Sequence, residues 1–190
     1  MKKIIMVSTN NTCRSFIAES LLRQLLLDAH QKNIEVISRG LVVLFPEPVH
    51  VKAADMVIQK CGIESLDFQS AQLTQEEVEQ SDLILTMTEE QKEKILEEYH
   101  GYKEIATLNE YASVEGAIID PYGMEDDDYE RCFEQIAHLV KKIWEERLGG
   151  NEMIGIGSDH GGYALKQAVI KHLEDLSLIH ISEPTRLDVI

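Results

Sequence analysis

The chain has 190 residues, 34 of them acidic and 18 basic, which gives a formal net charge of −16 at pH 7. Its 44% of hydrophobic residues can form a sizeable core and exclude an intrinsically disordered chain. The deficit of Lys and Arg argues against a nucleic-acid or membrane partner, and no apolar run approaches the roughly 18 residues of a membrane span. Three widely spaced cysteines indicate a reduced, cytoplasmic protein, and no residue spacing indicates a metal or a cofactor.

Apolar runs and helical periodicities alternate along the first third of the chain. Residues 4–7 form an apolar run that predicts a buried strand. A polar turn follows, and from Ser15 the spacing of apolar residues predicts a helix. Residues 34–37 are the second predicted strand, residues 40–48 a loop with two prolines, and residues 51–60 a helix that a glycine ends.

The alternation continues as far as residue 148. Residues 75–80 are predicted to form a short helix, because a threonine precedes them and a glutamate follows that threonine by three positions, the pattern of a capping box. Residues 83–87 are predicted to be a third buried strand, residues 89–99 a helix and residues 105–108 a weaker fourth strand. The longest helix is predicted over residues 126–148, where acidic residues come first and one apolar stripe follows.

Strands that alternate with helices predict an α/β fold, with a four-stranded parallel sheet and helices on both faces. In such sheets ligands bind at the carboxyl ends of the strands. Two segments are therefore candidate sites: the turn after the first strand and the segment around Asp120. A further strand, a glycine-rich turn and a helix are predicted over residues 153–173, an incomplete βα unit that is too short to form a second domain.

The turn after the first strand has the residues of an anion site. Polar or small residues lead from Ser8 to Arg14, and a helix opens directly afterwards. Backbone amides of such a turn can form a concave nest, and the N-terminus of the helix adds partial positive charge. The planar guanidinium of Arg14 can bind two oxygens of one anion. The turn therefore favours a phosphate dianion, although an ordinary polar turn between strand and helix contains the same residue types.

This segment resembles the phosphate loop of the low-molecular-weight protein tyrosine phosphatases, a family that includes the bacterial protein arginine phosphatases. The family pattern is Val-Cys-x-Gly-Asn-x-Cys-Arg-Ser, and Asn11, Cys13, Arg14 and Ser15 match it. Two later segments resemble the family in the same order, residues 82–88 and the sequence Asp120-Pro121-Tyr122-Gly123 of its general-acid loop. The resemblance covers residues 1–148 and implies a phosphatase-like domain that acts on phosphorylated proteins.

The resemblance also implies a role for each residue of the loop. Arg14 and the backbone amides of the loop would bind the phosphoryl oxygens, Asn11 would brace the loop, and Ser15 would hydrogen-bond the residue at the nucleophile position. Asp120 would protonate the leaving group and then activate water. The substrate-binding residues expected on this basis are Thr9, Asn10, Asn11, Thr12, Cys13, Arg14 and Ser15.

Two residues depart from the family pattern. Ser8 stands where the family has its nucleophilic cysteine, and Asn10 where it has glycine. A serine hydroxyl ionises far less readily than a thiol, so Ser8 is expected to reduce catalytic turnover strongly and to leave phosphate binding intact. Asn10 is expected to be the milder change, because asparagine tolerates left-handed backbone angles. The alternative to a phosphatase is therefore a catalytically dead pseudophosphatase that binds phosphate ion or phosphoproteins.

Thr12 bears on the substrate. The resemblance associates threonine at this position with the arginine phosphatases and isoleucine with the tyrosine-specific relatives. The glycine directly after Asp120-Pro121-Tyr122 also favours the arginine group. Phosphoarginine is therefore the slightly preferred substrate over phosphotyrosine.

After a linker at residues 149–151, the chain resembles a second family. Residues 152–175 are similar to the start of the type B ribose-5-phosphate isomerases, in which Asp159 and His160 match residues that contact the sugar phosphate. The resemblance implies a fusion to a truncated isomerase that lacks its catalytic residues. Residues 176–186 resemble one reading frame of a transposon-end adapter used for sequencing libraries, so residues 176–190 are interpreted as an artefactual tail.

Overall fold

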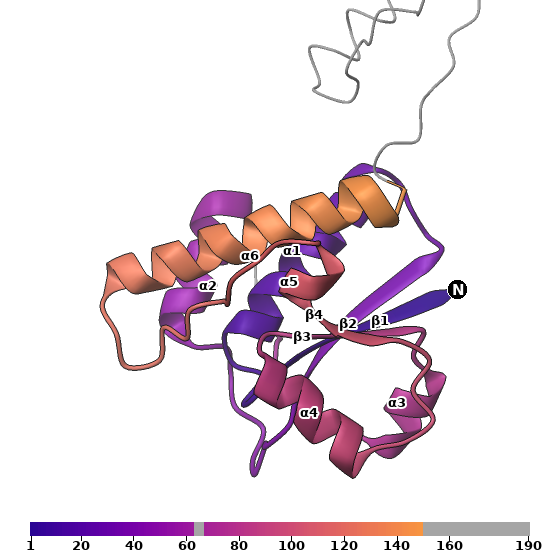
Figure 1. Cartoon of the computed structure of the whole chain (residues 1–190). Helices are drawn as coiled ribbons and strands as arrows, with labels where there is room; N and C mark the ends of the chain where they lie inside the picture. Colours follow the sequence, from indigo (N-terminus) through magenta and orange to yellow (C-terminus); the bar gives the residue numbers. More distant parts are fainter. Residues whose placement is uncertain (63–66, 150–190) are drawn as a thin grey trace, which may run out of the picture. The chain divides into compact units, whose positions relative to one another are not determined.

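A four-stranded parallel sheet lies at the centre of the fold (Figure 1). The computed structural model describes residues 1–62 and 67–149. The spatial order of the strands is β2-β1-β3-β4. The strand β2 therefore pairs with one side of β1, and β3, which comes later in the chain, pairs with the other side of β1. The strands are β1 (Lys2–Ser8), β2 (Ile34–Gly40), β3 (Leu83–Thr86) and β4 (Ile105–Thr107).

Helices cover both faces of this sheet (Figure 1). Four helices pack against one another and against one face: α1 (Arg14–Asp28), α2 (Val51–Cys61), α5 (Leu108–Tyr111) and α6 (Asp126–Arg147). The other face carries the smaller α3 (Gln75–Gln80) and α4 (Glu89–Glu98). The predicted α/β fold with a parallel sheet is thereby confirmed. The predicted βα unit over residues 153–173 lies outside the described residues.

The central strand β1 explains why both layers form. Side chains of a strand alternate between the two faces of a sheet. Ile4 and Met6 accordingly belong to the core under α1 and α6, whereas Ile5 and Val7 belong to the core under α3 and α4. None of these four side chains is exposed to solvent. The continuous apolar run is thus the pattern of a strand buried on both faces.

Helix ends follow the predicted signals. Thr74 and Glu77 form a reciprocal capping box at the start of α3. Thr88 and Gln91 form another at the start of α4, and Gly62 ends α2 in the left-handed conformation that glycine adopts without strain.

One helix was not predicted. Residue 108, expected to end the fourth strand, instead begins α5, which is only four residues long. The signal was present, because Thr107 and Glu110 form a third capping box. A single helical turn is too short for an apolar periodicity to reveal it.

No helix within residues 1–62 and 67–149 combines the length and the apolar character that crossing a bilayer demands.

Gly40 ends β2 directly against the turn that follows β1. Ser8 and Gly40 are register partners, and the next two amides, of Leu41 and Val42, donate to the carbonyls of Ser8 and Thr9 at 3.0 and 2.9 Å. A Cβ atom on Gly40 would lie 2.5 Å from Val43 Cγ2, 3.0 Å from the Thr9 carbonyl oxygen and 3.1 Å from a backbone carbon of Asn10. Glycine is therefore the residue that lets β2 approach this turn.

Gly40→Ala is expected to lower the free energy of unfolding by about 1–3 kcal/mol, because the added methyl group must displace the backbone of the turn. Urea denaturation of the full chain measures this. Gly62→Ala is the comparison variant. A Cβ atom at position 62 would meet open space, but φ there is +65°, so this variant measures the cost of backbone strain without a steric clash. An unchanged unfolding midpoint for Gly40→Ala would show that the turn is not tightly packed on β2.

Candidate active site

A pocket of about 330 Å³ opens at the carboxyl ends of β1, β2 and β3. This is the edge of the sheet where ligands bind in parallel α/β folds, and the strand order reverses there between β1 and β3. The segment after β1, the loop after β2, the start of α4 and the segment before α6 all contribute to its lining. The lining residues are Thr9, Arg14, Leu41, Val42, Thr88, Glu90, Gln91, Lys94, Ile118 and Asp120.

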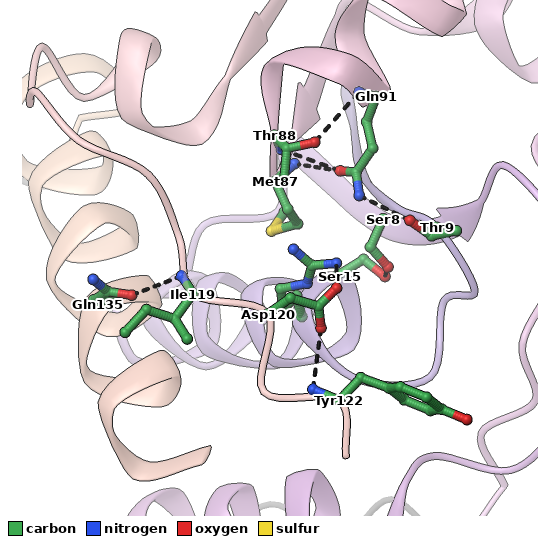
Figure 2. Close-up of polar contacts among 11 residues, drawn as sticks. Ser8, Thr9, Ser15, Met87, Thr88, Gln91, Ile119, Asp120, Tyr122 and Gln135 are labelled. Atoms are coloured by element: carbon green, nitrogen blue, oxygen red, sulfur yellow. Dashed lines mark hydrogen bonds and ion pairs between the residues drawn. The ribbon is translucent and has the colours of Figure 1, made fainter. Parts of the chain in front are cut away.

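Arg14 and Asp120 form an ion pair in this pocket. They are 106 positions apart in the chain, and Arg14 Nη2 lies 2.5 Å from Asp120 Oδ2. The Arg14 side chain is buried, whereas the Asp120 side chain is 56% exposed. Asp120 Oδ1 also accepts a hydrogen bond from the Tyr122 amide at 3.2 Å, while the exposed Tyr122 ring points away from the pair (Figure 2). The structure thus brings together the two segments that the sequence singled out.

Ser8 is buried at the end of β1, and its Oγ lies 2.7 Å from Ser15 Oγ. Ser15 Oγ accepts a hydrogen bond from Asn11 Nδ2 at 3.0 Å. Both hydroxyls are buried, and either one can be the donor of the hydrogen bond between them. The contact places Ser15 where its hydroxyl can donate to the atom at position 8.

Asn11 connects the turn to its surroundings. Its Nδ2 donates to Ser38 Oγ on β2 at 2.8 Å as well as to Ser15, and its Oδ1 accepts from the Ala71 amide at 3.0 Å. Ser38 in turn donates to a carboxylate oxygen of Glu19 on α1 at 2.6 Å. The turn is therefore fixed by buried side-chain hydrogen bonds to β2 and α1.

The backbone angles correct one expectation. The sequence placed the tolerance for a left-handed conformation at Asn10, where the family has glycine. The structure places positive φ one residue later, at Asn11, with φ of 60°. Asn10 is exposed and is not among the residues with positive φ. Asn11 adopts this conformation because its side-chain hydrogen bonds offset the cost of the backbone angle.

Gln91 holds α4 against the turn, a contact that the sequence did not predict. Its Oε1 accepts from the Met87 and Thr88 amides at 3.0 and 3.2 Å, and its Nε2 donates to Thr9 Oγ1 at 3.1 Å (Figure 2). The side chain is buried. The sequence predicted that this helix begins at residue 89, but the contact of Gln91 with Thr9, directly after β1, depends on the strand order.

The N-terminus of α1 faces this site without a side-chain cap. Cys13 is the N-cap residue and makes no side-chain hydrogen bond to the helix, and the first turn contains no acidic residue. The first amides of a helix have no intrahelical acceptor, so they are available to an anion.

The Cys13 thiol is not ionised in this site. Burial, together with the neighbouring Cys132, raises its pKa to about 12, so the thiol stays protonated at neutral pH. Both cysteines are free thiols.

The Thr12 carbonyl accepts a hydrogen bond from the His50 amide at 2.8 Å, which connects this side of the turn to the start of α2.

The sequence also led to predictions about metal binding and about the residues after 150. In residues 1–62 and 67–149, no group of three or more His, Cys, Asp and Glu side chains could hold a metal ion. Asp159 and His160 lie outside the described residues, as do the segments expected at residues 152–175 and 176–190.

Known proteins resemble the chain over this region. The model of the family "low molecular weight phosphotyrosine protein phosphatase" matches residues 3–152. The low molecular weight protein-tyrosine-phosphatase PtpB of Staphylococcus haemolyticus is 33% identical over 141 residues, which are 74% of this chain and 96% of that protein. PtpB of Staphylococcus aureus is 32% identical over the same shares.

Solved structures agree with this match. A low molecular weight protein tyrosine phosphatase from T. tengcongensis superposes with a TM-score of 0.72 at 29% identity, covering 77% of this chain and 99% of that one. A structure of the YwlE arginine phosphatase, described as a cysteine-to-serine mutant with a phosphorylated active site serine, superposes with a TM-score of 0.68 at 30% identity and covers 77% and 98%. The chain therefore belongs to the low-molecular-weight phosphotyrosine protein phosphatase family.

Proposed function

We propose that this chain removes phosphoryl groups from phosphorylated protein side chains, with Ser8 at the nucleophile position. The observation that carries the proposal is the convergence of Arg14 and Asp120 on one pocket at the carboxyl end of β1, the strand whose last residue is Ser8. Arg14 supplies the anion-binding guanidinium, and the uncapped start of α1 supplies amides. The amides of Thr9–Cys13 complete the binding site for the phosphoryl oxygens.

Substrate binding rearranges the Arg14–Asp120 ion pair. A phosphoryl dianion offers several oxygens to the planar guanidinium, whereas Asp120 offers one oxygen at the pocket mouth. Arg14 therefore turns its donors to the phosphoryl group, and the exposed Asp120 is released toward the leaving group. Asp120 then acts as the general acid, which donates a proton to the leaving group.

The first chemical step transfers the phosphoryl group to Ser8. The Ser8 oxygen forms a bond to phosphorus while the bond from phosphorus to the leaving side chain breaks, and Asp120 protonates the departing atom. In the described part of the chain, no His or Lys hydrogen-bonds to Ser8, so the Ser8 proton passes to a phosphoryl oxygen. Water then attacks the phosphoserine and Asp120 accepts a water proton. As the bond from phosphorus to the Ser8 oxygen breaks, the proton held on the phosphoryl oxygen returns to the Ser8 oxygen, and phosphate leaves.

The replacement of cysteine by serine slows both steps. A serine hydroxyl is far from ionised at neutral pH, and an alkoxide leaves phosphorus less readily than a thiolate does. The YwlE mutant with a phosphorylated active site serine supports the first step, because it shows a serine in a related protein that carries the phosphoryl group. We infer that transfer to Ser8 occurs and that hydrolysis of the phosphoserine limits turnover.

A second candidate is a pseudophosphatase that binds phosphate or phosphoproteins without turning them over. The surroundings of Ser8 favour it, because in the described part of the chain no His, Lys or carboxylate hydrogen-bonds to the Ser8 hydroxyl and could take its proton. The two candidates share the binding site and differ only in whether phosphorus is transferred to Ser8.

The proposed substrate is a phosphoarginine side chain rather than phosphotyrosine. The relatives carry both names: PtpB is a protein-tyrosine phosphatase, and YwlE is an arginine phosphatase. Thr12 supports the arginine alternative through the resemblance described above.

We also propose that residues 152–175 are the truncated start of a type B ribose-5-phosphate isomerase, in which Asp159 and His160 are remnants of a sugar-phosphate site. The support is the sequence resemblance alone. This segment contributes no activity to the proposed function.

Inorganic phosphate or vanadate should raise the thermal unfolding midpoint. Ligand at about 100 times its Kd adds about 2.7 kcal/mol to the free energy of unfolding. Arg14→Ala should abolish the shift, whereas Arg131→Ala, which removes a surface arginine paired with Asp128 on α6, should retain it. Differential scanning fluorimetry measures both. Parent protein that shows no shift at any ligand concentration would contradict an anion-binding turn.

Ser8→Cys should raise phosphatase turnover by orders of magnitude, because Arg14 and Asp120 are already in place and only an ionisable nucleophile is missing. Steady-state hydrolysis of para-nitrophenyl phosphate by the two proteins measures the ratio. In the Ser8→Cys background, Asp120→Asn should slow release of the leaving group. A Ser8→Cys protein that binds phosphate yet stays inert would favour the pseudophosphatase.

A further inference from the structure

The pocket contains a second carboxylate, that of Glu90, which the proposed chemistry does not use. Glu90 lies in the first turn of α4, after β3, whereas Asp120 lies in the segment before α6. Its own backbone amide and the Thr88 side chain hydrogen-bond the Glu90 carboxylate and hold its pKa below the ordinary value. Glu90 is therefore ionised at neutral pH and is tethered at the pocket.

No cation neutralises this carboxylate in the described part of the chain. Lys94 stands one turn along α4 and also lines the pocket, but its Nζ lies 3.9 Å from Glu98 and makes no ion pair with Glu90. Glu89, the neighbour of Glu90, is paired with Lys92 and does not line the pocket. Glu90 thus presents a negative charge to whatever occupies the pocket.

The pocket combines a buried cation, Arg14, with buried apolar surface from Leu41 and Ile118 and with the exposed carboxylates of Glu90 and Asp120. A phosphoarginine side chain has a group that complements each kind of lining: a phosphoryl anion, a planar guanidinium with several N–H donors, and a methylene stem. The ring of phosphotyrosine has no N–H donor, so it would strip water from a carboxylate without replacing the lost hydrogen bond.

We propose that Glu90 is a specificity-determining residue that accepts hydrogen bonds from the guanidinium of a phosphoarginine side chain. The inference rests on the proposed function, since it requires Arg14 to hold the phosphoryl group. Asp120 reaches the departing nitrogen as the acid, and Glu90 binds the remaining N–H groups from the α4 side of the pocket. Glu90 touches the leaving group and takes no part in proton transfer.

Isothermal titration calorimetry of the full chain tests this assignment. Every protein carries Ser8→Ala, which prevents phosphoryl transfer during the titration. Three ligands are compared at neutral pH: inorganic phosphate, a phosphoarginine peptide, and a phosphotyrosine peptide of otherwise identical sequence. The variants are Glu90→Gln, which keeps the size of the side chain and removes its charge, and Glu89→Gln as the matched control on the same helix turn.

Glu90→Gln should weaken binding of the phosphoarginine peptide about fivefold, the scale of a partly exposed charged contact. Its affinity for inorganic phosphate should stay within about twofold, and the phosphotyrosine peptide should bind equally well or more tightly. Glu89→Gln should leave all three affinities unchanged.

Three results would overturn the assignment: unchanged affinity of Glu90→Gln for the phosphoarginine peptide, equal weakening of both peptides, or the same loss in Glu89→Gln. Inorganic phosphate separates this failure from that of the proposed function. If phosphate binds and only the Glu90 effect is missing, the inference fails alone. If phosphate binds none of the proteins, the proposed function fails as well.

Discussion

The side chain of Asn11 is the connection on which the rest of the site depends. It donates to Ser15 on α1 and to Ser38 on β2, and it accepts from the Ala71 amide, all within 3.0 Å. These bonds hold Asn11 itself in a left-handed conformation that costs energy for a residue other than glycine. Because the network is buried and its polar groups are satisfied, it fixes one shape for the turn. Arg14 and the start of α1 are positioned by that shape.

The same network sets the limits of the chemistry at Ser8. Ser15 Oγ lies 2.7 Å from Ser8 Oγ, so its hydroxyl can donate to negative charge at this position, which suits a nucleophile that is already ionised. A thiolate meets that condition and a serine hydroxyl does not. The proposed function therefore assigns anion binding and charge stabilisation to the site, and proton removal from Ser8 to the substrate. This division explains why phosphoryl transfer and its subsequent hydrolysis are expected to differ in rate.

Much of the fold could be predicted because its signals are local. The apolar run of β1 and the threonine caps of α3 and α4 reflect residues within one or two turns of each other. The candidate turn was singled out by its residue order after the first strand and by its resemblance to the family's phosphate loop. Gly40, Ser38 and Gln91 were missed because their importance arises from β2 and α4 meeting the turn across the sheet. Glu90 was missed for a second reason: an acidic residue early in a helix is ordinarily explained by its favourable interaction with the helix dipole.

The proposed function turns on whether Ser8 accepts a phosphoryl group from the substrate. Intact-mass spectrometry of the full chain after incubation with a phosphoarginine peptide measures this transfer, with fragmentation to locate the modified residue. We expect a gain of one phosphoryl group per chain, located on Ser8, and no gain in Arg14→Ala or Ser8→Ala. A parent chain that binds the peptide and remains unmodified, or one that is modified at another residue, would rule out phosphoryl transfer to Ser8.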